Sequence, residues 1–137
     1  GSGPMEPDVR NHYVGKISQE QLPIYYNASD VVIVPSTHEE GFGRVIIESL
    51  ACGTPVIAAN RGAIPEAMNN SVGKLITILP KNISDTINYF QSRPDRLLTL
   101  SKNARSFAVL NYSSTNANKI ISVYDLPILS EQNNVIK

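Results

Sequence analysis

Short apolar runs recur along the middle of the chain and predict strands. Four consecutive β-branched residues occupy positions 31–34, and "PVIAA" over 55–59 is a second buried run. "GKLITI" over 73–78 is a third, and "HYVG" predicts a short strand over 12–15. Short runs that are apolar on both faces are typical of central strands in a parallel sheet, which helices cover on both sides.

Helical patterns separate these runs, and several carry start or stop signals. Ser18 is expected to cap the first helix, with Gln21 at the capping-box position. Gly53 and Pro55 are expected to end the second helix. In a long helix nearer the C-terminus, five apolar residues share one face: Leu97, Leu100, Ala104, Phe107 and Ala108. The predicted helices cover residues 18–29, 41–52, 62–70, 81–90, 93–112 and 112–125.

This alternation predicts an α/β fold, a Rossmann-like doubly wound parallel sheet with helices on both faces and right-handed crossovers. Ligands of such sheets bind beyond the carboxyl ends of the strands. The loops over 35–43 and 59–66 each follow a buried strand and open a helix, so both are expected at one rim. We expect one domain over 12–126. Residues 1–11 are interpreted as a cloning remnant or a truncated start, and residues 127–137 as a loose tail.

The composition fits a globular domain and narrows its partners. Of 137 residues, 42% are hydrophobic and 18% charged, and twelve basic side chains balance twelve acidic ones. Such neutrality gives no argument for nucleic acid as a partner. Cys52 is the single cysteine, interpreted as a buried small residue rather than a catalytic thiol, and no metal site is predicted. With a single cysteine, a reducing, cytoplasmic setting is expected. No apolar stretch reaches the ~18 residues of a membrane span.

Two glutamates, Glu40 and Glu48, bracket a Gly-Phe-Gly turn and an apolar run. As a catalytic acid/base pair they would be far apart, because eight residues along a continuous helix span roughly 12 Å. The carboxyl pairs of glycosidases lie about 5 to 9.5 Å apart. Gly41 and Gly43 let the backbone approach a ligand, and a helix N-terminus binds anions such as a diphosphate. The spacing therefore favours two ends of a grip on an elongated ligand.

A simpler reading needs no ligand. Glu40 near a helix N-terminus stabilises the helix dipole by itself, and Glu48 fits a solvated helix position. The apolar character of "VIIESLA" over 45–51 weakens this alternative, because a helix buried on most faces rarely buries a carboxylate without a partner. On spacing alone, both readings stay open.

The same residues carry a family resemblance. From about Tyr13 to Tyr124 the chain resembles the donor-binding region of retaining, family 4 glycosyltransferases with the GT-B fold (glycosyl transferases group 1). The matching segments are "YVGKISQEQLPIYYNASDVVIVPS", "EEGFGRVIIESLACGTPVIA", "RGAIPEAM" and "GKL". The most specific one is the E-x7-E element, in which "GFGRVII" separates Glu40 from Glu48 and "CGTPVIA" follows in register.

The resemblance implies roles for individual residues. Glu40 corresponds to the catalytic-site residue that contacts the donor sugar near its anomeric centre, and Glu48 to the residue that binds the ribose. The segment from Val14 to Lys16 corresponds to the loop that touches the nucleobase, and Glu66 to a structural position in the second rim loop. The glycine-rich turn corresponds to backbone donors for the sugar and the diphosphate: Gly41, Phe42 and Gly43.

The chain departs from the family pattern at several places. Arg44 stands where an aliphatic residue is common; we hypothesise that it adds a cation beside the diphosphate, and a solvated arginine is the alternative. Ala63 follows Gly62 where the family often has two glycines. The N-terminal acceptor lobe of the family, and the Arg/Lys pair that neutralises the diphosphate, have no counterpart in these 137 residues.

The function implied by the resemblance is that of half an enzyme. We expect the C-terminal lobe of a GT-B hexosyltransferase, lacking its first strands, that binds a UDP-, GDP- or ADP-sugar without a metal or other cofactor. The expected partners are the nucleotide sugar and the missing N-terminal lobe, and the resemblance is compatible with a full-length enzyme peripheral at a membrane surface. The isolated chain is expected to be inactive. The alternatives are a GT-B epimerase or phosphorylase, and a non-catalytic nucleotide-sugar-binding or interaction module.

Overall fold

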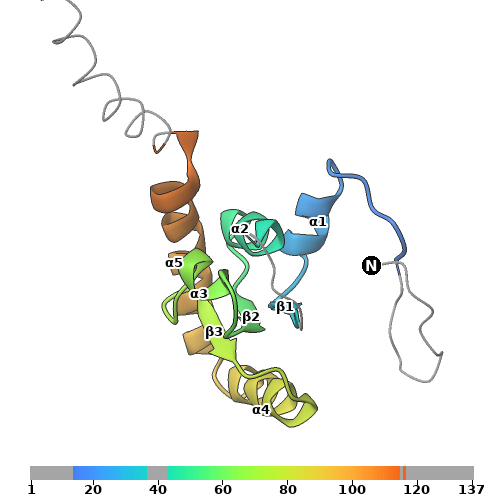
Figure 1. The fold of residues 1–137 in the computed structure, drawn as a ribbon, viewed down its shortest axis with the longest axis vertical. Coiled ribbons are helices and arrows are strands. Elements are labelled where there is room, and N and C mark those ends of the chain that lie inside the picture. Colours follow the sequence, from blue (N-terminus) through green and yellow to red (C-terminus); the bar gives the residue numbers. More distant parts are fainter. Residues whose placement is uncertain (1–13, 37–42, 115, 117–137) are drawn as a thin grey trace, which may run out of the picture.

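The fold is built on a parallel sheet of three described strands (Figure 1). The computed structural model describes residues 14–36, 43–114 and 116. Its strands are β1 (Val32–Val34), β2 (Val56–Ala59) and β3 (Gly73–Ile76), in the order β1-β2-β3. Both strand pairs are parallel, with Val32 opposite Val56 and Val56 opposite Gly73. All three strands lie within the runs that the sequence predicts, and β2 is buried along its whole length.

Helices connect the strands and cover both faces of the sheet, which confirms the predicted α/β class (Figure 1). Each described helix overlaps a predicted one, and the first three helices are shorter than predicted. Parallel neighbours need such crossover segments because a tight turn only joins antiparallel strands. The described helices are α1 (Leu22–Asn27), α2 (Arg44–Ala51), α3 (Ile64–Ala67), α4 (Pro80–Gln91) and α5 (Pro94–Tyr112).

Alternate strand residues supply two hydrophobic clusters, one on each face of the sheet. Val34, Val56 and Ala58 belong to the first cluster, and Ile57 belongs to the second. The first cluster also includes residues of α2, α3 and α5: Ile46, Leu50, Ile64, Ala104 and Ala108. The second cluster includes residues of β3, α4 and α5: Ile76, Phe90 and Leu100. Because successive side chains of a strand point to opposite faces, the apolar runs of the sequence serve both layers.

Helix α5 is shared between the two clusters. Leu100 and Leu97, in its first half, pack in the cluster around Ile57. Ala104 and Ala108 are buried in the cluster around Val56, and Phe107 packs against it. The single apolar face predicted for this helix is therefore confirmed. It contacts both layers because α5 packs against α2, which contributes to the first cluster, and against α4, which contributes to the second.

The end of α2 follows the predicted stop signal. Gly53 has φ +81°, a left-handed conformation that favours glycine. Its N–H donates to the Leu50 carbonyl at 2.9 Å, and the N–H of Thr54 donates to the Ser49 carbonyl at 3.0 Å. This pair of bonds is a Schellman motif. It directs the chain from α2 straight into β2.

The predictions for the N-terminal region need correction. Val14 and Gly15 are not in a strand, and the rest of the predicted strand lies outside the described residues. Helix α1 begins at Leu22, and Gln21, not Ser18, occupies the N-cap position without a side-chain cap bond. The reason is Pro23, which lacks an N–H and fits only the first turn of a helix. A helix that began after Ser18 would place this proline in the second turn.

Helix α2 also begins later than predicted. Its first residue is Arg44, because Gly43 has φ +65° and ψ +47° and so cannot continue a right-handed helix. The separation of roughly 12 Å expected for Glu40 and Glu48 assumed one continuous helix, and Glu40 lies outside the described residues. Most of the helix predicted over 112–125 lies outside the described residues.

Candidate functional site

The carboxyl ends of the three strands border a shared cavity of about 230 Å³. Ser36 follows β1, Asn60 and Arg61 follow β2, and Thr77 follows β3, and all four line this cavity. The N–H of Asn60 donates to the Ile76 carbonyl at 2.8 Å, which ties the second strand end to the third. Segments of both predicted rim loops thus meet at one edge of the sheet, as the sequence predicts. This edge is where ligands of parallel α/β sheets bind.

Gly43 opens α2, the helix that carries Glu48. A Cβ atom on Gly43 would lie 3.1 Å from Cδ1 of Ile46, and the positive φ disfavours any side chain there. The Gly43 carbonyl accepts the N–H of Ile46 at 2.9 Å, which starts the helix. The earlier N–H groups of an α-helix have no carbonyl partner within the helix, and they carry the positive end of its dipole. The glycine is thus required by the backbone conformation and by packing.

Glu48 lies one turn into α2, and both of its carboxylate oxygens accept hydrogen bonds. The Tyr26 hydroxyl of α1 donates to Oε2 at 3.0 Å. The Arg44 guanidinium donates to Oε1 at 3.3 Å, in an i,i+4 ion pair. The Glu48 side chain is 32% exposed, whereas that of Arg44 is 72% exposed. The carboxylate is therefore half-buried and oriented, yet still open to a ligand.

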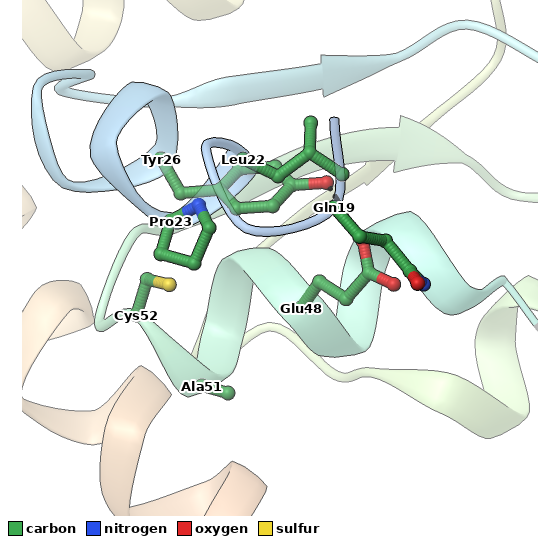
Figure 2. Close-up of a pocket in the computed structure, with 7 residues that line it drawn as sticks. All are labelled: Gln19, Leu22, Pro23, Tyr26, Glu48, Ala51 and Cys52. Carbon is green, nitrogen blue, oxygen red and sulfur yellow. Dashed lines mark hydrogen bonds between the residues drawn. The ribbon is translucent and has the colours of Figure 1, made fainter. Parts of the chain in front are cut away.

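A second cavity, of about 290 Å³, lies between α1 and α2 (Figure 2). Figure 2 shows the Glu48 carboxylate, the Tyr26 hydroxyl and the Gln19 amide gathered at one end, with Ala51 and Cys52 at the other. The remaining lining is apolar: Leu22 and Pro23 of α1. A cavity with apolar walls and a few convergent polar groups is the usual form of a small-molecule site.

Burial and the neighbouring carboxylate change the acidity of Tyr26. Desolvation, followed by the hydrogen bond to Glu48 and the charge of that residue, raises the pKa of Tyr26 to about 12. Each of these effects disfavours a phenolate beside a carboxylate. The Tyr26 hydroxyl therefore remains a hydrogen-bond donor throughout the pH range in which a protein normally works.

The raised pKa of Tyr26 predicts a loss of stability in alkali. Folded Tyr26 keeps its proton to about pH 12, whereas the unfolded phenol loses it near 10. The protonated Tyr26 adds on the order of 2 kcal/mol to the free energy of unfolding. This stabilisation is fully present below pH 10 and is lost as the pH rises from 10 towards 12. Urea unfolding of the parent and of Tyr26→Phe at pH 9 and pH 11.5 measures this. The gap between the two proteins should narrow at pH 11.5, and an unchanged gap would contradict the shift.

The structure brings together some of the predicted site residues and leaves others apart. Arg44 is 72% exposed, as in the solvated alternative, and it also forms an ion pair with Glu48. Val14 and Lys16 are exposed and are not among the residues that line the cavity beside Glu48. Three further residues of the predicted site lie outside the described residues: Glu40, Gly41 and Phe42.

The structure corrects two predictions about burial, one for α2 and one for Cys52, which follows it. The helix is not buried on most faces, because Val45 is 44% exposed while Ile46 and Leu50 are fully buried. Cys52 is half-buried rather than buried, and desolvation, the largest influence, raises the pKa of its thiol. Such a thiol is a poor nucleophile at neutral pH, in keeping with the packing role predicted for it.

The remaining observations concern Glu66, membrane spans and metal ligands. Glu66 is exposed in α3, and its backbone carbonyl accepts the Tyr112 hydroxyl at 3.4 Å. Among the described residues, no helix is long and apolar enough to cross a membrane. In that same part of the chain, no three His, Cys, Asp or Glu side chains gather as metal ligands would.

Tyr26 is a residue of the cavity between α1 and α2 that no motif in the sequence identifies. It is buried in α1, whereas its neighbour Tyr25 is 41% exposed. The hydrogen bond to Glu48 joins residues 22 positions apart on different helices. No local pattern in the sequence signals such a contact.

Known proteins resemble this chain over most of its length. Residues 7–107 match the family model described as glycosyl transferases group 1. A D-inositol 3-phosphate glycosyltransferase from Thermobispora bispora is 38% identical over 109 residues, which make up 77% of this chain and 25% of that protein. The chain thus spans about a quarter of the length of this relative.

Solved structures show the same arrangement. Sucrose-phosphate synthase from Thermosynechococcus elongatus superposes with a TM-score of 0.73 at 33% identity, over 83% of this chain and 29% of that one. Anabaena HepE in complex with UDP superposes with a TM-score of 0.71 at 30% identity, over 77% of this chain and 30% of that one. HepE has also been solved with UDP-glucose.

Proposed function

Because the chain belongs to the glycosyl transferases of group 1 and has the fold of a GT-B C-terminal domain, we propose that it binds the nucleotide-diphosphate sugar donor of a retaining hexosyltransferase. The observation that carries this proposal is the placement of Glu48. Its oriented, half-open carboxylate lies on α2, the helix that follows β1 in the chain. The complexes of HepE with UDP and UDP-glucose support a uridine nucleotide as the first donor to test.

In the proposed complex, each part of the E-x7-E element has one task. Glu48 accepts hydrogen bonds from the ribose hydroxyls, and the first N–H groups of α2 hold the diphosphate, with Arg44 adding positive charge nearby. By their match to the motif, Glu40 contacts the donor sugar and Gly41 and Phe42 offer backbone donors. As the diphosphate leaves, its developing charge is stabilised by the helix terminus.

No metal ion is needed for this arrangement, because the helix N-terminus and the arginine supply positive charge directly. Binding of UDP is therefore expected to be the same in EDTA and in magnesium. The chain spans about a quarter to three tenths of the length of its relatives, and the proposed contacts are all with the donor. We accordingly expect donor binding without sugar transfer by these 137 residues.

Calorimetric titration of the chain with UDP, GDP and ADP tests the proposal. One nucleotide, UDP in the first instance, is expected to bind selectively. Glu48→Gln should weaken that binding by roughly 10-fold or more, because a charge-assisted hydrogen bond contributes about 1.5–3 kcal/mol. Asp85→Asn is the matched control, since Asp85 forms an exposed i,i+4 pair with Lys81 on α4, as Glu48 does with Arg44 on α2.

Two outcomes would overturn the proposal. One is the absence of binding by all three nucleotides at millimolar concentration. The other is an equal loss of affinity in Glu48→Gln and Asp85→Asn, which would show that the carboxylate of Glu48 has no specific role. If a longer chain that contains this segment also binds the donor but transfers no sugar, the non-catalytic binding module becomes the better reading.

A further inference from the structure

Tyr26 is held in place independently of Glu48. Its backbone carbonyl accepts the Thr54 hydroxyl at 2.7 Å, and the Thr54 carbonyl in turn accepts the Ser49 hydroxyl at 2.9 Å. Tyr26, Thr54 and Ser49 are all buried. Because buried hydrogen bonds of this kind are costly to break, these two bonds hold α1 against the end of α2. The buried phenol ring therefore stands on a backbone segment that is fixed relative to α2.

The two donors to Glu48 differ in strength. The Tyr26 bond is 3.0 Å long and comes from a buried ring, whereas the Arg44 bond is 3.3 Å long and comes from a mostly exposed side chain. Exposed i,i+4 ion pairs contribute only about 0.3–0.5 kcal/mol. The orientation of the carboxylate is thus set mainly by Tyr26. The raised pKa of Tyr26 keeps its proton available for this bond at any working pH.

The carboxylate keeps acceptor capacity after both bonds are made. An ionised carboxylate offers about four lone-pair positions, and the protein fills two of them. The hydroxyls of a vicinal diol match the remaining two only if the carboxylate plane is fixed. Without the Tyr26 bond, the half-exposed Glu48 side chain can adopt several rotamers. Binding a diol would then have to restrict it to one rotamer, and this loss of conformational entropy would weaken the binding.

We propose that Tyr26 is a positioning residue that orients the Glu48 carboxylate so that the site selects ligands with both ribose hydroxyls. This inference rests on the proposed function and deepens it. It assigns the preference for ribonucleotides to a pair of residues on two helices, Tyr26 and Glu48. Tyr26 itself acts through Glu48 and needs no contact with the ligand.

The test is the ratio of two affinities, measured by titration with UDP and with 2′,3′-dideoxy-UDP. The parent chain is expected to bind UDP roughly 10-fold or more tightly than the dideoxy nucleotide. Tyr26→Phe keeps the ring but removes the donor, and should lower this ratio at least 3-fold while leaving the affinity for dideoxy-UDP within 2-fold. Tyr25→Phe, at the neighbouring and exposed tyrosine, is the matched control and should keep the parental ratio.

The outcomes separate this inference from the proposed function. If the parent binds no nucleotide, the proposed function fails and this inference fails with it. If the parent discriminates and Glu48→Gln removes the discrimination, but Tyr26→Phe keeps the parental ratio, only the inference is overturned. A purely structural role for Tyr26 would lower both affinities together and would also overturn it.

Arg44→Ala supplies a variant that does not depend on the folding of Tyr26→Phe. Arg44 is exposed, so its removal should leave the fold intact. We expect the ratio of UDP to dideoxy-UDP affinity to persist in Arg44→Ala, even where both affinities fall. Collapse of the ratio in this variant would assign the positioning role to Arg44 and overturn the assignment to Tyr26.

Discussion

A Gly73→Ala substitution is expected to lower the free energy of unfolding by more than about 3 kcal/mol. A Cβ atom on Gly73 would lie 2.0 Å from the carbonyl oxygen of Val56 and 2.7 Å from Cε of Met68. The methionine side chain can move, but the Val56 carbonyl is backbone of the neighbouring strand. Relief of the clash requires β2 and β3 to separate at Val56 and Gly73, which are register partners. Urea denaturation followed by circular dichroism measures the loss.

Gly53→Ala distinguishes this clash from a general effect of replacing glycine. Gly53 has a positive φ, but a Cβ there would meet its nearest neighbour at 3.7 Å, an ordinary contact. We expect a loss of about 1 kcal/mol from backbone strain alone. If Gly73→Ala were as stable as Gly53→Ala, the close approach between the two strands would be wrong.

Leu50→Ala is expected to cost about 3 kcal/mol of unfolding free energy, the second largest effect. Leu50 is fully buried in α2, in the cluster that includes Val56 and Ala104. Its replacement removes apolar burial and leaves a cavity between a helix and the sheet, where the neighbours are fixed by strand pairing. Thermal and urea unfolding of the purified variant give the magnitude.

Val45→Ala is the control for Leu50→Ala on the same helix. Val45 is 44% exposed, so the substitution removes little buried surface and also improves helix propensity. We expect a change within about 0.5 kcal/mol. Equal losses in the two variants would mean that α2 presents a different face to the sheet from the one described.

Much of the fold can be predicted from the sequence because its signals are local. The β-branched run that contains β1 and the glycine after α2 each act within a few residues. The apolar face of α5 is likewise visible as a period of three to four residues. Strand and helix order then restricts the topology to parallel crossover units, and the binding edge follows from that topology.

Features that depend on contacts between distant residues could not be predicted in this way. The pairing of Tyr26 with Glu48 requires the packing of α1 against α2. The tight approach at Gly73 appears only once β3 lies beside β2. The late start of α1 is different, since Pro23 marks it in the sequence and the capping-box pattern competed with that signal.

In the candidate site, too, some features have a local signal in the sequence and others depend on contacts between distant residues. The resemblance implies a ribose-binding role for Glu48, and the i,i+4 spacing of Arg44 and Glu48 is one at which such side chains meet on a helix. The direction in which the carboxylate points depends on a tyrosine from another helix. A motif gives the residue types of a site, whereas the geometry that decides ligand selectivity comes from the surrounding packing.

The shared position of α5 bears on how the domain unfolds. Since its first half completes one hydrophobic layer and its second half completes the other, neither layer keeps its core if this helix detaches. Separate opening of one layer is therefore disfavoured, and the amide protons of β2 should exchange with solvent only through global unfolding. We expect this helix to make the small domain, with its two hydrophobic clusters, unfold as one cooperative unit.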